Sequence, residues 1–376
     1  MATSADHKFI SLTLSLASRG LYTTDPNPRV GCILVNGGSI VGQGWHQKPG
    51  GPHAEIMALE EAGEKANGAV CYVSLEPCCH QGKTPPCTDA LIKAGVQRVV
   101  AAMTDPNPQV AGQGIEQLIQ AGVPAVAGIS AADAEALNIG FVTRMSLGRP
   151  YVRCKLAMSL DGRTALKSGE SRWITSAEAR QDVQRLRARS SAILTGIGTV
   201  LVDDPGLRVR LEELGAYPAE EVRQPLRVVV DTHLSLPEDA NVLKSPGSCL
   251  IATTRSYDGY SKNLEDKGAE VLCLPQKGRH GGVDMLQLLQ ELGKREVNEV
   301  LLEAGATLAG HMLQQGLIDE LVVYMAPKLM GDEAKGLFHL PGLETMDQIC
   351  SLDIANVRHV GADLRITAHP IYTEKA

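Results

Sequence analysis

Histidine, glutamate and cysteine residues in the first quarter of the chain have the types and spacing of a metal site. His53 and Glu55 stand two residues apart, and the stretch "EPCCHQGKTPPC" follows with Cys78 and Cys87, each directly after a proline. One imidazole and two thiolates would give Zn²⁺ three protein ligands, and a catalytic zinc site leaves its fourth position for water. Water bound in such a site loses a proton near neutral pH.

The order of these residues narrows the chemistry. A His-x-Glu followed by Pro-Cys and a further cysteine is typical of zinc-dependent deaminases, in which the glutamate transfers protons and is not a ligand. Here eight residues separate Cys78 from Cys87, where the usual pattern has two. A structural zinc site stays open as an alternative, because Cys79 or His80 could supply a fourth ligand.

The elements around these residues would bring them together. His53 opens a helix that ends at Gly63, and the strand "AVCYVSL" leads into the cysteine loop. A second helix should begin after Cys87, with Thr88 and Asp89 as cap residues. A Cys87 thiolate would then lie at the positive end of the helix dipole, which favours its ionisation.

The rest of the first half predicts an α/β sheet. The apolar runs "VGCILV" and "SIVGQGWH" are joined by "NGG", a strong hairpin signal, and "RVVAAM" reads as a later strand. "FISLTLSLA" is not expected to be a signal core, because Asp6 precedes it without a basic n-region and its apolar residues alternate with hydroxyl residues. It is expected to form an amphipathic helix that is capped near Ser4 or Asp6 and ends by Gly20.

A second α/β domain should start after "FVTRMSLGRP", whose Gly148 and Pro150 interrupt the pattern. The predicted domains are residues 1–147 and 150–370. In the second, a helix begins at Ser176, and 192–200 reads as a strand. Its "TGIGTV" lacks the third glycine of a dinucleotide fingerprint. "LLEAGATLAG" instead predicts a strand ending at Glu303 and a helix from about Thr307, whose amides could hold a phosphate.

Composition limits the partners. The 376 residues include 36 basic and 43 acidic side chains, a net charge of −7, which argues against a nucleic-acid surface. No apolar run of about 20 residues is present, so no membrane span is expected. The nine cysteines are scattered along the chain, as in proteins of the reducing cytoplasm. A small molecule is the expected partner, and a homo-oligomer the expected assembly.

Several motifs together resemble one family. "TDPNPRVG", "GPHAE", "LEPCCHQGKTPPC" and "DPNPQVAGQG" in the first half, and "KLAMSLDGRTAL", "SGESRWIT", "VLVDDPGLRVR", "VLLEAGATLAG" and "DELVVYMAPKLMG" in the second, are similar to the bifunctional riboflavin-biosynthesis deaminase-reductases, the RibD family. The eight-residue gap belongs to that family. The resemblance implies an N-terminal three-layer α/β/α zinc domain like that of cytidine deaminase, and a C-terminal α/β domain like dihydrofolate reductase.

For the first domain the resemblance implies hydrolytic deamination of a phosphoribosylaminopyrimidine. Its zinc ligands would be His53, Cys78 and Cys87, and Glu55 would be the catalytic proton carrier. Cys79 stands where the family commonly has a small residue such as serine, so it is not expected to bind metal. The substrate residues implied are Asn27, His80 and Lys83.

For the second domain the resemblance implies reduction of the ribose to a ribityl chain, with NADPH as cofactor. The cofactor residues would be Ala157, Trp173, Thr199, Asp203, Thr232, Gly305, Ala306, Thr307, Leu308, Ala309, Gly310 and His311. The substrate residues would be Ser171, Arg187, Leu207, Arg210 and Glu303. The proton donor stays open between Glu303 and Asp203.

Two other hypotheses compete with that of a bifunctional enzyme. The chain could be a simple nucleobase deaminase with a noncatalytic tail, or a zinc-stabilised binding module in which Glu55 has no catalytic part.

Overall fold

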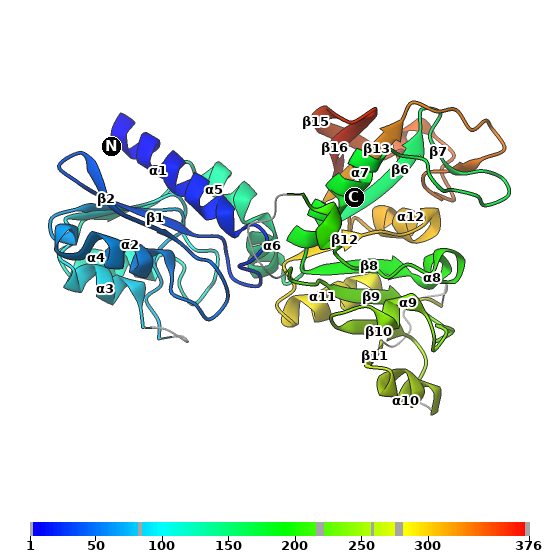
Figure 1. Cartoon of the computed structure of the whole chain (residues 1–376), viewed down its shortest axis with the longest axis horizontal. Coiled ribbons are helices and arrows are strands. Elements are labelled where there is room, and N and C mark those ends of the chain that lie inside the picture. Colours follow the sequence, from blue (N-terminus) through cyan, green and yellow to red (C-terminus); the bar gives the residue numbers. More distant parts are fainter. Residues whose placement is uncertain (1–2, 82–84, 216–221, 257–258, 275–280, 373–376) are drawn as a thin grey trace. The chain divides into compact units, whose positions relative to one another are not determined.

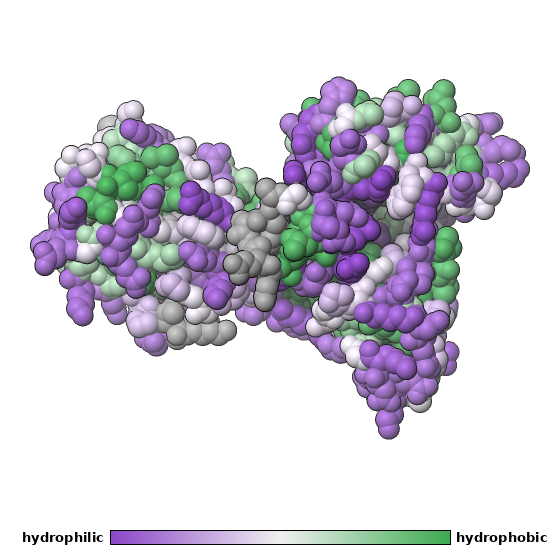
Figure 2. Space-filling model, viewed as in Figure 1, coloured by the Kyte–Doolittle hydropathy of each residue, from purple (hydrophilic) through white to green (hydrophobic). Residues whose placement is uncertain are grey.

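The chain folds into two compact units, Met1–Gly148 and Arg149–Ala376 (Figure 1). The computed structural model describes residues 3–81, 85–215, 222–256, 259–274 and 281–372. Lys83 lies outside these described residues. Hydrophilic residues predominate on the face of each unit shown in Figure 2, with smaller hydrophobic patches between them.

The first unit is a five-stranded sheet in the order β2-β1-β3-β4-β5. Strands β2 and β3 run antiparallel to β1, and β3, β4 and β5 are parallel to one another. Gly37 and Gly38 both have positive φ in the tight turn between β1 and β2, which confirms the predicted hairpin. The strands are β1 (Gly31–Asn36), β2 (Ser39–Trp45), β3 (Val70–Val73), β4 (Arg98–Ala101) and β5 (Ala125–Val126).

Helices cover both faces of this sheet, which gives three layers (Figure 1). Apolar residues of α1 (Ser4–Ala17) and α5 (Ala131–Leu137) pack on one face. Those of α2 (Ala54–Ala62), α3 (Cys87–Lys93) and α4 (Gln113–Gln120) pack on the other, and α6 (Ile139–Leu147) ends the unit. The three-layer α/β/α prediction is therefore confirmed.

Two glycines set the position of α2 on the sheet. A Cβ at Gly44 would lie 2.5 Å from the Ala54 carbonyl oxygen, and one at Gly42 would lie 2.2 Å from that of Ala58. Only glycine allows the helix backbone to approach β2 this closely. The contact fixes the start of α2, and with it His53.

The second unit is built on a nine-stranded sheet in the order β11-β10-β9-β8-β12-β6-β13-β16-β15. Neighbouring strands are parallel from β11 to β13, whereas β16 runs antiparallel to both β13 and β15. The strands are β6 (Tyr151–Ser159), β8 (Ala192–Gly196), β9 (Leu226–Val230), β10 (Cys249–Thr253), β11 (Ala269–Cys273), β12 (Glu299–Leu302), β13 (Glu320–Ala326), β15 (Ser351–Val360) and β16 (Asp363–Ile371).

Two apolar cores lie on opposite faces of this sheet. One contains α11 (Met285–Lys294) and α12 (Ala306–Gln314), and the other contains α7 (Ala177–Arg189), α9 (Asn241–Lys244) and α10 (Gly259–Asp266). A helix α8 (Ile197–Asp203) follows β8, and a separate small sheet pairs β7 (Arg163–Ala165) with β14 (Lys335–Gly336).

Some sequence predictions need correction at the ends of elements. The strand expected over 192–200 stops at Gly196, and its last residues form α8. The cap of α1 is Thr3, whose hydroxyl accepts from the Asp6 amide, while the Asp6 carboxylate accepts from the Thr3 amide. Helix α3 already starts at Cys87, and α12 starts at Ala306. The predicted Ser176 cap of α7 is confirmed by its bond from the Ala179 amide.

Candidate active sites

The predicted metal ligands of the first unit come together in the folded chain. His53 precedes α2, Cys78 lies in the loop after β3, and Cys87 is the first residue of α3. Their ligand atoms all lie within 4.8 Å of one another, the one such trio of histidine, cysteine or acidic side chains within the described ranges. The starts of two helices and the loop after β3 thus bring these three side chains together.

The separations fit a tetrahedral zinc ion. His53 Nδ1 lies 3.2 Å from Cys87 Sγ and 3.6 Å from Cys78 Sγ. Zinc bonds of about 2.0 Å to nitrogen and 2.3 Å to sulfur at a tetrahedral angle would hold those atoms about 3.6 Å apart. One nitrogen and two sulfurs are also the donors that zinc prefers.

Hydrogen bonds and burial shift the pKa values of the three candidate ligands. The pKa of Cys78 is lowered to about 4, because the Cys87 thiol and then His53 form hydrogen bonds to it. The pKa of Cys87 is raised, since it is the donor to Cys78 and is buried. The pKa of His53 is also raised, mainly by its bond to Cys78. By these directions, Cys78 is the more easily ionised of the two thiols.

Glu55 lies beside the metal ligands but is not one of the trio. Its side chain is buried, and burial, followed by the charge of Cys78, raises its pKa to about 7. A carboxylate that gains and loses a proton near neutral pH is suited to proton transfer.

A second buried glutamate holds the cysteine loop in place, and the sequence did not reveal it. Glu76 accepts hydrogen bonds from the amides of Asp105, Gly112 and Ile115. The second "DPNP" turn, which starts at Asp105, is thereby tied to the start of the loop that carries Cys78. The only sequence signal was an acidic residue between a buried strand and Pro77.

Asn27 and His80 are the described substrate candidates of this unit. The Asn27 amide nitrogen lies 2.9 Å from His46 Nε2, and the His46 ring meets the His53 ring edge-on, with 5.6 Å between centroids. His80 is exposed in the cysteine loop, and its charge helps to lower the pKa of Asp105 against the rise that burial causes. Sequence reasoning missed His46, whose one signal was a polar residue at the end of a strand.

The second unit contains a cavity of about 1100 Å³ at the ends of β6, β8 and β12. A pocket for one small ligand usually measures about 300–1,000 Å³, so this cavity has room for two. Basic side chains outnumber acidic ones in its lining, which suits phosphate groups. The basic residues are Lys155, Arg172, Arg180, Arg187, Arg208, Arg210 and Lys335, and the acidic ones are Asp203, Asp204 and Glu303.

Most of the residues predicted for the second unit line this cavity. They are Ala157, Ser171, Trp173, Arg187, Thr199, Asp203, Leu207, Arg210, Glu303, Gly305, Ala306, Thr307 and Leu308. The lining does not include Thr232, Ala309, Gly310 or His311. A Cβ at Gly310 would lie 2.1 Å from the His339 carbonyl oxygen, so this glycine allows α12 to pack against the chain at His339.

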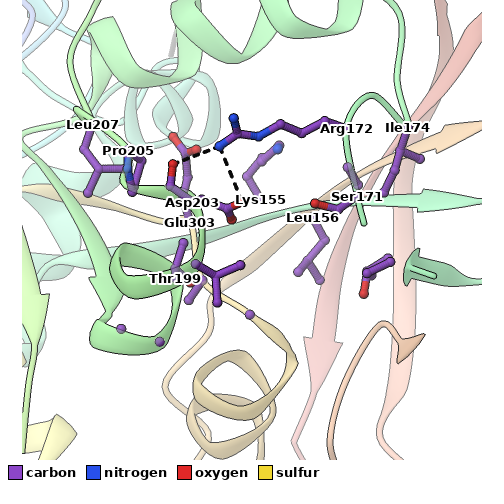
Figure 3. A pocket seen from close by; sticks show the side chains of 18 of the residues that line it. Lys155, Leu156, Ser171, Arg172, Ile174, Thr199, Asp203, Pro205, Leu207 and Glu303 are labelled. Carbon is purple, nitrogen blue, oxygen red and sulfur yellow. Dashed lines mark hydrogen bonds and ion pairs between the residues drawn. The ribbon is translucent and has the colours of Figure 1, made fainter. Parts of the chain in front are cut away.

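Several charged residues inside the cavity form pairs, and Figure 3 shows that of Arg172 with Asp203. Arg187 Nε and Nη2 donate to the two oxygens of Glu303 at 2.6 and 2.9 Å. Although burial raises the pKa of Glu303, Arg187 lowers it further, so this carboxylate stays ionised. Asp203 contacts Arg172 instead. Lys155, which sequence reasoning missed, points into the same space near Glu303, and its pKa is lowered by burial.

The fold and the two sites define the class of protein. The first unit is an α/β metalloenzyme with a three-ligand site, and the second is an α/β unit whose cavity can hold large phosphorylated ligands. Among the described residues, no helix has both the length and the apolar character needed to cross a membrane.

Known proteins place the chain in a family. Residues 3–103 match the cytidine and deoxycytidylate deaminase zinc-binding region, and residues 150–366 match the RibD C-terminal domain. The riboflavin biosynthesis protein RibD of Escherichia coli is 50% identical over 364 residues, 96% of this chain and 98% of that protein. RibD of Haemophilus influenzae is 45% identical over 98% of both chains. The chain belongs to the RibD family of riboflavin biosynthesis proteins.

Solved structures agree with this assignment. Acinetobacter baumannii RibD superposes with a TM-score of 0.90 at 45% identity, over 98% of this chain and 99% of that one. A Thermotoga maritima protein described as a diaminohydroxyphosphoribosylaminopyrimidine deaminase/5-amino-6-(5-phosphoribosylamino)uracil reductase superposes with 0.84 at 31% identity, over 98% and 99%. The predicted family and the fold of both halves are confirmed.

As a member of this family, the protein is a bifunctional enzyme of riboflavin biosynthesis, with zinc-dependent deaminase and NADPH-dependent reductase activities. Its partner is a small-molecule substrate. The noncatalytic tail and the binding module are excluded, because the family match spans both units.

Proposed function

We propose that residues 1–147 deaminate 2,5-diamino-6-(5-phosphoribosylamino)pyrimidin-4(3H)-one to 5-amino-6-(5-phosphoribosylamino)uracil, and that residues 150–370 then reduce the ribosyl group to ribityl with NADPH. The trio of His53, Cys78 and Cys87 with Glu55 beside it carries the first assignment. The basic cavity of the second unit supports the other.

In the deamination, Zn²⁺ held by His53, Cys78 and Cys87 would supply a water that is acidic enough to be ionised near neutral pH. The Glu55 carboxylate accepts a proton as water adds to the amine-bearing carbon. It delivers that proton to the ring nitrogen, then takes the proton of the new hydroxyl group and passes it to the amine, which leaves as ammonia while the carbonyl forms. Because Glu55 is buried and its pKa is about 7, it can both take and give a proton at the working pH.

In the reduction, NADPH would supply a hydride. The ionised Glu303, held by Arg187, is placed to accept from substrate hydroxyls and not to donate a proton. We therefore favour Lys155 over Glu303 and Asp203 as the acid, since it lies beside Glu303 and burial lowers its pKa toward neutrality. Arg208, Lys335 and Arg210, which also pairs with Glu213 at 2.9 Å, are the proposed partners for phosphates in the lining.

One substitution tests the first step. Glu55→Gln keeps the shape of the side chain but cannot carry the proton, so we expect ammonia release to fall about 10²–10⁴-fold. Zinc content and NADPH-dependent reduction of the deaminated substrate should stay normal in the same preparation. Loss of zinc from this variant would contradict the assignment, because it would make Glu55 a ligand. Product analysis with and without NADPH identifies the two steps in order.

We also propose that the protein is a cytoplasmic homo-oligomer. All nine cysteines are free thiols, as expected in a reducing compartment. Strand β15 is an outer strand of the large sheet, and Leu352, Ile354 and Val357 are 46%, 61% and 53% exposed on it. A long apolar edge strand is usually covered by a partner, and a second copy of the chain is the commonest one.

The oligomer is tested on that strand. Ile354→Lys should lower the mass measured by analytical ultracentrifugation to that of a monomer. The matched change Asp353→Lys, on the next residue of the same strand, should not. A wild-type monomer, or equal masses for both variants and the wild type, would refute this interface.

A further inference from the structure

His46 is a buried side chain next to the metal ligands that the deamination mechanism does not use. It directly follows β2 and is 4% exposed. Its Nδ1 lies 3.0 Å from the Pro52 carbonyl oxygen, and its Nε2 lies 2.9 Å from Asn27 Nδ2. The ring therefore bridges the turn that carries Asn27 and the residue that precedes His53.

The Pro52 contact fixes where the imidazole proton is. A carbonyl oxygen can only accept a hydrogen bond, so Nδ1 of His46 must carry a hydrogen. In the neutral ring, Nε2 then has a lone pair and accepts. Of the two ends of the Asn27 amide, only the NH₂ group can donate to it. The chemistry of Pro52 thus determines which way the Asn27 amide is turned.

The other end of that amide is left for a ligand. Across the described parts of the chain, Asn27 Oδ1 has no hydrogen-bond partner, and it is not among the buried polar atoms that lack one. It is therefore an accessible acceptor. Its neighbour His46 touches the ring of His53, which places this acceptor close to the metal site.

We propose that His46 is a positioning residue that turns the Asn27 amide so that its oxygen faces the substrate, and that the deaminase consequently selects a pyrimidine with an N–H donor at that place. The inference rests on the proposed placement of Asn27 in the substrate site. Ring N–H and amino groups of a diaminopyrimidinone satisfy this oxygen. An analogue with a ring nitrogen lone pair or an N-methyl group there leaves the oxygen unpaired, which costs binding energy.

A double-mutant cycle on His46 and Asn27 shows whether His46 acts by positioning Asn27 or only by stabilising the fold. Asn27→Leu removes the acceptor, and His46→Phe removes the bond that orients it. Each should raise KM for deamination about tenfold or more, with a smaller change in kcat. The double variant should lose no more than Asn27→Leu alone, because no amide remains to be oriented. His46→Gln should recover much of the loss, since its amide oxygen can accept from Asn27.

The direction of the amide has its own test. Asn27→Asp keeps an oxygen toward the substrate, so its KM should be clearly lower than that of Asn27→Leu. If Asn27 donated to the substrate, Asp would be as poor as Leu, and the proposal would fail. A ¹⁵N spectrum of the wild-type protein reads the tautomer directly, and a proton on Nε2 of His46 in place of Nδ1 would overturn it.

Controls distinguish a wrong substrate from a wrong inference about His46. Zinc content and NADPH-dependent reductase activity are measured in every variant to show that both units are folded. If the wild-type enzyme fails to deaminate the diaminopyrimidinone, the proposed substrate is wrong whatever the variants do. If the wild type is active and the losses of His46→Phe and Asn27→Leu add in full, His46 has only a structural part and the inference is wrong.

Discussion

The two units bind their reactants in contrasting ways. In the first, three candidate ligand atoms lie within 4.8 Å of one another, and a buried carboxylate stands beside them. In the second, a cavity of about 1100 Å³ is lined by residues of β6, the end of β8 and the segment that follows β12. The first site is a small cluster of reactive side chains, whereas the second is a cavity with room for two ligands.

The same contrast shows in how buried charges are treated. At Glu55, burial prevails and the pKa rises to about 7, so the group can exchange a proton. At Glu303, the Arg187 partner prevails and the carboxylate stays ionised. The two buried carboxyl groups thus differ in pKa because only Glu303 has a paired guanidinium, and not because one is buried more deeply.

The largest expected effect is the loss of the first centre. His53→Ala or Cys78→Ala leaves only two ligands, and we expect zinc content and ammonia release to fall to background. The matched change Cys79→Ser, one residue further along, should leave both normal, because Cys79 is not in the trio. Zinc by elemental analysis and ammonia by a coupled assay check this. Loss of zinc in Cys79→Ser would mean that the site is structural with four protein ligands.

A smaller effect is expected in the cavity. Lys155→Met keeps the length of the side chain and removes its proton, so reductase kcat should fall about 10²-fold if the amine is the acid. NADPH binding and deamination should hardly change. The control Lys335→Met removes another cavity lysine and should act mainly on KM. An unchanged kcat in Lys155→Met would return the choice of proton donor to Asp203.

The contrast also explains what the sequence could predict. Residue types and spacing pointed to a zinc site at His53, Cys78 and Cys87 and left Cys79 or His80 open as a fourth ligand, because ligand chemistry is local and short segments carry it. Glu76, His46 and Lys155 were missed, because each acts through contacts with segments far away in the chain. In the cavity, only the segment around Glu303 and Thr307 had a pattern of its own, and the other residues came from the resemblance to a family.

Secondary structure shows a related limit. The run at 192–200 is β-branched and apolar, which suggested one strand. The chain instead turns at Gly196 into α8, whose first turn lines the cavity with Gly198 and Thr199. The β propensity of a short segment does not show where the strand stops, and here it stops at the edge of the sheet where ligands bind. The hairpin of β15 and β16 was not predicted for a different reason, because β15 has no buried residue and β16 has only Asp363 and Ala368.

The smallest expected effect concerns a buried carboxylate of the second unit that has no part in chemistry. Asp182 accepts from the Tyr324 hydroxyl at 2.6 Å and pairs with Arg365 and Arg358. Burial raises the pKa of Asp182, but the Tyr324 bond and the two arginines lower it more, so its pKa is below the ordinary value. It therefore behaves like Glu303 and unlike Glu55.

This direction sets a pH dependence of stability. The contribution of Asp182 is present above the unfolded pKa, near 3.9, and is lost as pH falls through the lower folded pKa. We expect Asp182→Asn to reduce the unfolding free energy of the second unit by about 1–3 kcal/mol near neutral pH. The difference from wild type should shrink below about pH 4. Calorimetry of the whole chain, with the second unit's transition identified by its shift with NADPH, measures it. As a control, Tyr324→Phe removes a neutral donor and leaves the two arginines. Its loss of unfolding free energy should be smaller and should depend less on pH. If the difference between Asp182→Asn and wild type grows as the pH falls, burial and not the arginines sets the pKa of Asp182.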